Sequence, residues 1–262
     1  MGHDAIILGG GAAGLFCAAV ASQRGRRVLV LEKAEAVGKK ILISGGGRCN
    51  FTNLECHPSR FLSQNPHFAK SALARFTPWD FIERMSAHDL TWHEKTLGQL
   101  FCDQKSPAII KFLLDDLESA GGKLQLSCPV SDISRTGDEF VIDTSEGRFQ
   151  AQSLIMACGG LSIPKIGATG FGYDIARQFG LPVTETRPRA CPLHLPRRPV
   201  QTALRRLPPR ASVQHPHQLR RGAALHPPWP LWPRGFAGVV LLARGRADHG
   251  EPCPRGHSVG RP

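Results

Sequence analysis

A glycine-rich run near the N-terminus has the residue types and spacing that bind a diphosphate. Gly9, Gly11 and Gly14 follow the apolar residues 6–8 and precede an apolar, alanine-rich stretch. In such a turn the first glycine permits a sharp bend, the second lets backbone approach a pyrophosphate, and the third lets a helix pack closely on a strand. Free N–H groups at the helix N-terminus then favour an anion. Residues 9–14, Ala13 among them, are therefore a candidate nucleotide-binding turn.

An acidic residue follows where a dinucleotide site requires one. Residues 27–31 are expected to form a short buried strand, and Glu32 comes directly after it. Dinucleotide sites carry such an acid roughly 20 residues beyond the glycine motif, where its carboxylate can accept hydrogen bonds from a ribose diol. An isolated glutamate here would be read as a solvated strand-end acid. The order strand, turn, helix, strand and acid favours the nucleotide interpretation.

A second glycine run combines close backbone approach with positive charge. Residues 44–48 read Ser-Gly-Gly-Gly-Arg, and Lys39 and Lys40 lie just upstream. This combination suits a diphosphate or an electron-rich ring. Asn50, Thr52 and Asn53 add amide and hydroxyl groups that can read the edge of a heterocycle. A second part of the same site is therefore expected here.

The surrounding pattern is that of an α/β protein with a parallel sheet. Ser106 and Pro107 have the residue types of a helix cap and first turn, and residues 123–126 follow as a third parallel strand. Residues 140–143 and 148–151 are expected to form an antiparallel excursion, after which residues 154–157 return to the sheet. That strand ends at Cys158-Gly159-Gly160, where open α/β sheets bind ligands.

Two stretches between these elements are not assigned a functional role. Residues 65–85 contain two helical stretches, and their aromatic residues Phe68, Phe76, Trp79 and Phe81 are expected to be core rather than a stacking platform. Residues 92–95 fit a surface turn as well as a substrate wall. His93 is therefore not assigned as catalytic.

Several long segments of this sequence resemble those of a known flavoprotein family. The words GKKILISGGGRCNFTN, TWHEKTLGQLFC and ACGGLSIPKIGATGFGYDIARQFGL are similar to those of the BaiN-like or aminoacetone-oxidase-like NAD(P)/FAD-dependent oxidoreductases. The resemblance covers about residues 4–187. It implies a Rossmann-like FAD-binding fold of the glutathione-reductase-like two-dinucleotide-binding-domain type, and FAD as cofactor. The family usually has Thr where this chain has Cys158, so a hydroxyl is replaced by a thiol.

The resemblance assigns roles to the motif residues. The first glycines and Glu32 would bind the ADP half of FAD, Val130 would meet the adenine through its backbone, and the second glycine run would lie along the pyrophosphate and flavin. The candidate cofactor-binding residues are Gly9, Gly11, Ala13, Gly14, Glu32, Lys33, Lys40, Ser44, Gly45, Gly46, Gly47, Arg48, Asn50, Asn53, Val130, Cys158, Gly159 and Gly160. No catalytic residue is assigned and no metal site is expected.

The C-terminal part of the chain, residues 188–262, differs sharply from the rest. Residues 1–187 carry 20 Lys+Arg against 19 Asp+Glu, whereas residues 188–262 carry 13 Arg, no Lys and 2 acids. This C-terminal part also holds 14 of the 21 prolines and 7 glycines, so its combined Pro and Gly content is in the range of low-complexity chain. Residues 1–187 are expected to be an incomplete FAD-binding domain, and residues 188–262 a disordered, frameshifted tail. Only residues 239–243 could form a strand.

Three functional hypotheses remain open from the sequence. The first is an FAD-dependent oxidoreductase of unknown substrate, using NAD(P)H or oxygen as redox partner. The second is an inactive, frameshifted fragment of that enzyme, which would bind FAD weakly or not at all. The third is a nucleic-acid-binding protein using the Arg-rich tail, which is disfavoured because no binding module accompanies it. With no secretory signal or apolar membrane span, and eight cysteines without CxxC spacing, a cytoplasmic protein with reduced thiols is expected.

Overall fold

The computed structural model describes residues 2–61, 65–186 and 240–242. All of the elements belong to one unit, formed by the described residues up to Leu181 together with Val240–Leu242. The helices are α1 (Ala12–Gln23), α2 (Lys39–Leu42), α3 (Lys70–Arg75), α4 (Pro78–Ala87), α5 (Lys105–Ser119) and α6 (Phe171–Gln178). Three 3-10 turns are η1 (Ser44–Gly47), η2 (Pro58–Arg60) and η3 (Pro164–Ile166). The strands are β1 (His3–Leu8), β2 (Val28–Leu31), β3 (Asn50–Asn53), β4 (Trp92–Glu94), β5 (Gln99–Cys102), β6 (Lys123–Gln125), β7 (Val130–Thr136), β8 (Glu139–Thr144), β9 (Gly147–Met156) and β10 (Val240–Leu242).

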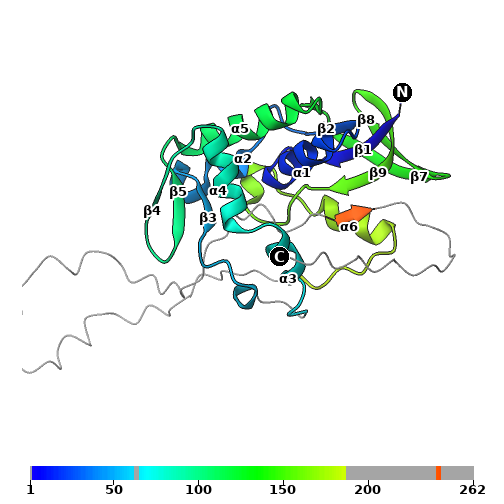
Figure 1. The fold of residues 1–262 in the computed structure, drawn as a ribbon. Coiled ribbons are helices and arrows are strands. Elements are labelled where there is room, and N and C mark those ends of the chain that lie inside the picture. Colours follow the sequence, from blue (N-terminus) through cyan, green and yellow to red (C-terminus); the bar gives the residue numbers. More distant parts are fainter. Residues whose placement is uncertain (1, 62–64, 187–239, 243–262) are drawn as a thin grey trace, which may run out of the picture. The chain divides into compact units, whose positions relative to one another are not determined.

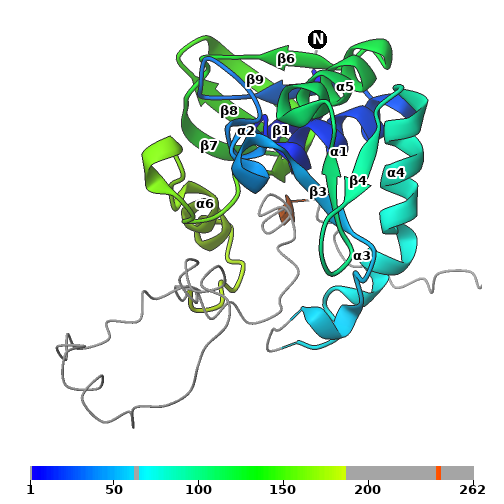
Figure 2. The same cartoon turned by 90° about the vertical axis from the view of Figure 1, so that its left-hand side faces the viewer.

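The main sheet is the Rossmann-like sheet expected from the sequence. Its strand order is β6-β2-β1-β9-β8-β7, and β1, β2, β6 and the end of β9 run parallel. Residues 3–31 thus build a β-α-β unit in which β1 pairs with β2 from Ala5 opposite Val28 to Leu8 opposite Leu31. β7 and β8 form the antiparallel excursion. Figures 1 and 2 show α1 and α5 lying together beside this sheet.

Strand β9 is longer than the sequence pattern indicated. The two expected strands at residues 148–151 and 154–157 are one continuous ten-residue strand. Its first half pairs with β8, its second half pairs with β10, and β1 runs along its other side. The suggested strand at residues 239–243 is confirmed as β10, which pairs antiparallel with residues 154–156.

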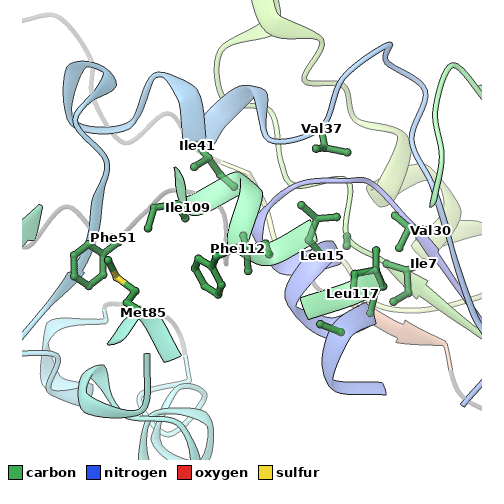
Figure 3. Packing of buried hydrophobic residues seen from close by; sticks show 14 of the residues in the cluster. Ile7, Leu15, Val30, Val37, Ile41, Phe51, Met85, Ile109, Phe112 and Leu117 are labelled. Atoms are coloured by element: carbon green, nitrogen blue, oxygen red, sulfur yellow. The ribbon is translucent and has the colours of Figure 1, made fainter. Parts of the chain in front are cut away.

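Alternate residues of β1 and β2 point to opposite faces of the main sheet, and both faces are covered by other elements. One face packs on α1 and α5 through a cluster that includes Ile7, Leu15, Val30 and Phe112. Figure 3 shows that Phe51 and Met85 extend this cluster toward the second sheet. The other face contains Ile6, Leu8, Leu29 and Leu31 together with residues of β7, β8, β9 and α6. Leu15 and Ile7 have no exposed surface, so the β-α-β unit is a rigid base.

A second, three-stranded sheet in the order β3-β5-β4 was not anticipated. Of the two interpretations left open for residues 92–95, the surface turn is wrong, because Trp92–Glu94 form β4 and pair with β5. Backbone pairing over such short polar stretches leaves little local signal. This sheet holds the residues after the second glycine run against residues 99–102, which come much later in the chain.

Two helix-level expectations are corrected. Ser106 does not cap α5, because the helix begins at Lys105 and the Ser106 hydroxyl instead donates to the carbonyl oxygens of Leu42 (3.3 Å) and Gly47 (2.7 Å). The capping pattern expected there occurs at Thr77, whose side chain and Asp80 form a capping box ahead of α4. Two aromatic residues expected in the core lie at the surface, since Phe68 is 81% and Trp79 is 64% exposed. Phe76 and Phe81 do pack inward.

The expected boundary at residue 187 lies outside the described residues, as do residues 188–239 and 243–262. The predictions of a disordered and frameshifted tail concern those residues. Among residues 188–262 the structure describes Val240–Leu242.

Candidate dinucleotide site

A cavity of about 810 Å³ opens where the parallel strands end. Its lining includes the residues at or just beyond the carboxyl ends of β1, β2 and β9, namely Gly9, Glu32 and Cys158. In open α/β sheets this is where ligands bind. The volume lies in the upper part of the range of roughly 300–1,000 Å³ that is typical of small-molecule sites.

The first glycine turn has the geometry that its spacing predicted. Gly9 has a φ of +113°, and a Cβ on Gly14 would collide with the Gly9 carbonyl oxygen, so the helix can approach the strand only with glycine there. A Cβ on Gly11 would meet nothing within 4 Å, because Gly11 faces the cavity. No side chain caps the N-terminus of α1 at Gly11, and its first turn carries no acid. The helix thus presents backbone N–H groups to an anion in the cavity.

Glu32 is locked against this turn. Its carboxylate accepts hydrogen bonds from the backbone N–H of Gly10 (2.7 Å) and of Ala34 (2.9 Å). Each carboxylate oxygen keeps a further lone pair for a ligand donor, and Glu32 is part of the cavity wall. The acid is therefore fixed beside the turn, in position to accept from a ribose hydroxyl.

Positive charge dominates the cavity wall. Glu32 is the one acid among the lining residues that the structure describes, and five basic side chains join it: Lys33, Lys39, Lys40, Arg48 and Lys95. A dinucleotide carries two negative phosphates, so this balance of charge suits it. Together with the open helix N-terminus, the donor set fits the ADP arm of a dinucleotide cofactor.

Two of these lysines connect the wall to residues 162–169, which were not predicted to line the site. Lys33 Nζ donates to the Gly167 carbonyl oxygen (2.7 Å), and Lys40 Nζ donates to Ser162 Oγ (3.0 Å). Residues 162–163 and 166–169 line the cavity beside them. Burial lowers the pKa of the Lys40 ammonium. The repeated glycines at 167, 170 and 172 were the signal that this segment approaches a ligand.

The second glycine run shapes the far end of the cavity. Gly45 and Gly46 both have left-handed φ values, and a Cβ on Gly45 would lie 2.7 Å from the Phe101 ring. The guanidinium of Arg48 lies 5.8 Å from the centre of that ring, and Lys95 Nζ lies 5.4 Å from it. The sequence left a wall role for residues 92–95 open, and Lys95 does line the cavity. Sequence reasoning missed Gln99 and Phe101 as wall residues, because strand pairing in the second sheet brings them there.

The structure brings thirteen of the eighteen candidate residues to the cavity wall and leaves five behind it. Those that line the cavity are Gly9, Gly11, Glu32, Lys33, Lys40, Ser44, Gly45, Gly46, Arg48, Asn50, Val130, Cys158 and Gly159. Those that do not are Ala13, Gly14, Gly47, Asn53 and Gly160. Asn53 serves the second sheet, because its side chain donates to the Leu97 carbonyl oxygen (2.8 Å) and accepts from the Glu55 N–H (2.7 Å).

Cys158 behaves as a small, half-buried residue of the cavity wall. Its thiol donates to the Leu8 carbonyl oxygen over 3.3 Å, and burial together with the charge of Glu32 raises the pKa of the thiol to about 11. A thiol that remains protonated is a poor nucleophile and a poor redox group. This supports the interpretation of Cys158 as a small substituted residue.

Comparison with known proteins identifies the family. The model of the HI0933-like protein Rossmann domain matches residues 3–248. The chain belongs to the HI0933-like Rossmann-domain family. This confirms the flavoprotein resemblance and the Rossmann-like fold that the sequence indicated. FAD supplies hydride chemistry when bound, and the residues that would hold its ADP arm here are those of the glycine turn, Glu32 and the basic wall.

Three curated relatives are similar to this HI0933-like chain. Ribosomal RNA dihydrouridine synthase of Escherichia coli is 51% identical over 195 residues, which cover 74% of this chain and 49% of that protein. The Haemophilus influenzae protein of the same name is 49% identical over 71% of this chain and 48% of its own length. The 3-dehydro-bile acid delta(4,6)-reductase of Clostridium scindens is 31% identical over 75% of this chain and 49% of its own length. The chain therefore spans about half the length of the curated relatives it matches.

Two searches of the described residues gave negative results. In those ranges no helix is long and apolar enough to cross a bilayer. Among the same residues no group of three or more His, Cys, Asp or Glu side chains is arranged to hold a metal ion.

Proposed function

We propose that this protein is an FAD-dependent reductase that adds hydrogen across a carbon–carbon double bond next to a carbonyl, with uridine in ribosomal RNA as substrate. The observation that carries the cofactor assignment is Glu32, held 2.7 Å from the Gly10 N–H at the wall of a basic cavity. The proposed FAD contacts are the thirteen candidate residues that line this cavity.

The reaction class is supported by what the relatives' names have in common. A dihydrouridine synthase saturates a ring double bond of uracil, and a delta(4,6)-reductase saturates double bonds of a 3-oxo steroid. In both cases the double bond is conjugated to a carbonyl, which is the arrangement that accepts a hydride readily. Uridine is preferred as substrate because two relatives near 50% identity carry that name. This departs from the sequence analysis, which disfavoured nucleic acid as a partner.

The redox partner follows from the direction of the reaction. Saturating one double bond consumes a hydride and a proton, so a reductase needs a donor, and we propose NAD(P)H in that role. The uracil ring, NAD(P)H and a proton then yield the saturated dihydrouracil ring and NAD(P)⁺. A substrate in ribosomal RNA would place the protein in the cytoplasm. Oxygen would serve as redox partner only if the protein were an oxidase, which NAD(P)H-driven oxygen consumption without RNA would reveal.

The test uses the purified full chain with FAD, NAD(P)H and ribosomal RNA that lacks dihydrouridine. The expected result is dihydrouridine in the nucleoside digest, dependent on both FAD and the reduced nicotinamide. Flavin binding without any dihydrouridine would overturn the substrate assignment. Saturation of a 3-oxo-4,6-diene steroid instead of uridine would transfer the assignment to that class. A folded chain that binds no FAD would overturn the cofactor assignment.

A further inference from the structure

One stretch of the chain has a composition unlike its surroundings. Residues 56–79 contain three Lys or Arg and no Asp or Glu, whereas the other residues up to 187 contain 17 Lys or Arg and 19 acids. The same stretch holds four aromatic residues and two histidines. Basic residues interleaved with aromatic ones and free of acids are typical of a surface that binds nucleic acid.

Within the described part of this stretch, residues 56–61 and 65–79, the segment 65–79 exposes the groups that such binding needs. Phe68 is 81% exposed and Trp79 is 64% exposed, which is unusual for rings of this size. Lys70 and Arg75 are exposed at the two ends of α3 between them. We call Phe68, Lys70, Arg75 and Trp79 the aromatic–basic surface.

The helix next to this surface is firmly attached to the fold. The Phe76 ring packs edge-on against Phe16 with ring centres 4.9 Å apart, and the capping box of Thr77 and Asp80 fixes the start of α4. Figures 1 and 2 show α3 as a short helix that follows on from one end of α4. The exposed rings are thus presented on an ordered support.

The same support adjoins the dinucleotide cavity. Phe16, which holds Phe76, is a residue of the cavity wall, and so is Phe81, two positions after Trp79. Phe81 in turn packs on Phe51 and Phe112, with ring centres 5.7 and 5.6 Å apart. A strand of nucleic acid lying on the aromatic–basic surface would therefore run beside the wall of the site where reduction is proposed.

We propose that the aromatic–basic surface binds single-stranded RNA next to the uridine that is reduced. Phe68 and Trp79 stack with bases, and Lys70 and Arg75 contact phosphates. This inference rests on the proposed function, of which it names the RNA-binding surface. RNA is favoured over a protein partner because residues 56–79, which supply this surface, contain basic residues and no acid.

The experiment measures binding of a labelled single-stranded RNA of about 12 nucleotides by fluorescence polarisation, within the usual site sizes. Phe68→Ala and Trp79→Ala are each expected to weaken binding about tenfold, since stacking contributes on the order of 1–3 kcal/mol per base. Lys70→Ala with Arg75→Ala is expected to reduce the slope of log affinity against log salt by about 1.4, as two phosphate contacts on single-stranded RNA require. The side chains are exposed, so the variants are expected to fold.

Matched controls separate this surface from general basicity. Leu97→Ala removes another exposed apolar side chain, and Lys111→Ala with Lys123→Ala removes two exposed cations from α5 and β6. Because the 13 arginines of residues 188–262 add binding that any RNA would show, affinities are compared between full-length variants. Controls that retain wild-type affinity while the three surface variants lose it support the proposal.

Two results would overturn it. The surface variants could bind RNA as the controls do, or they could lose self-association or a protein contact with RNA affinity unchanged. Dihydrouridine formation and FAD binding are measured in parallel on the wild type. If RNA binding maps to this surface while no uridine is reduced, the proposed function is wrong and the proposal that this surface binds RNA is supported. If uridine is reduced and the variants bind RNA normally, the proposed function is supported and the RNA-binding role of this surface is wrong.

Discussion

The two ends of the cavity are built in different ways. At the end formed by the first glycine turn and Glu32, where we propose that adenine diphosphate binds (the adenine-diphosphate end), these residues lie close together in the sequence, on adjacent parallel strands. At the far end Gly45 and Arg48 meet Phe101 and Lys95, which come from a distant part of the sequence, through the second sheet. The first end is a local β-α-β unit, whereas the second exists only after the chain has folded back on itself.

This difference teaches that the two ends can be disturbed separately. Changes in the glycine turn act on the base of the main sheet, where Leu15 and Ile7 have no exposed surface. Changes at Phe101 act on a smaller sheet whose strands have three or four residues. The adenine-diphosphate end should therefore bind ADP whether or not the far end is intact.

The largest effect is expected from Gly14→Ala. The added Cβ would collide with the Gly9 carbonyl oxygen, so α1 must move away from β1 and the base of the sheet is lost. Overpacking of this kind at a backbone contact should cost about 3 kcal/mol or more. Urea denaturation followed by circular dichroism measures it. The control Gly11→Ala meets nothing within 4 Å and should keep its stability. Equal losses in both variants would contradict the packing account.

A smaller and more selective effect is expected from Phe101→Leu. Phe101 is 4% exposed, and its ring faces Arg48 and Lys95. Removing the ring should lower FAD affinity about fivefold, since each cation–π contact contributes on the order of 0.5–1 kcal/mol. ADP affinity should fall less, because ADP has no flavin ring to contact the far end. Isothermal titration with both ligands tests this, with Phe140→Leu, buried in the other core cluster, as control. Parallel losses of ADP and FAD affinity would remove the distinction between the two ends.

Thr77→Ala should lower stability by about 1 kcal/mol without changing ADP affinity, because it removes the capping box of α4. The hydrogen bonds from Thr77 lower the pKa of the Asp80 carboxyl. A lowered carboxyl pKa stabilises the fold above the ordinary value near 3.9, and the gain is lost as pH falls through the lowered value. The difference between wild type and Thr77→Ala should therefore shrink in acid. Thermal melts at neutral and acidic pH measure it, and a constant difference would contradict the pairing.

The smallest effect concerns pH dependence at the adenine-diphosphate end. Burial lowers the pKa of Lys40, so its ammonium loses charge at a lower pH than an exposed lysine. ADP affinity should fall by a few-fold as pH rises through that lowered pKa. Lys40→Met should bind ADP more weakly at neutral pH and show a flatter profile in the same titration. An unchanged profile would mean that Lys40 does not face the phosphates.

The sequence predicted the first end of the cavity well, because glycine spacing and a strand-end acid are local signals. The fixed positions of Gly9, Gly14 and Glu32 agree with their predicted places. The far end was predicted only in part. The second glycine run was recognised, but Lys95 and Phe101 reach the cavity through a strand pairing that leaves no local periodicity in the sequence. Ser106 and Asn53 show the same limit, since each satisfies distant backbone groups that their neighbours in sequence do not reveal.

The central claim is that this chain holds the adenine diphosphate of a dinucleotide between its first glycine turn and Glu32. Isothermal titration of the folded full chain with ADP tests it most directly, comparing wild type with Glu32→Ala and with Glu35→Ala, an exposed acid that follows closely in the sequence. We predict saturable one-to-one binding that Glu32→Ala weakens at least tenfold and Glu35→Ala leaves unchanged. Folded wild-type protein that binds no ADP, or equal affinities in the two variants, would contradict the claim.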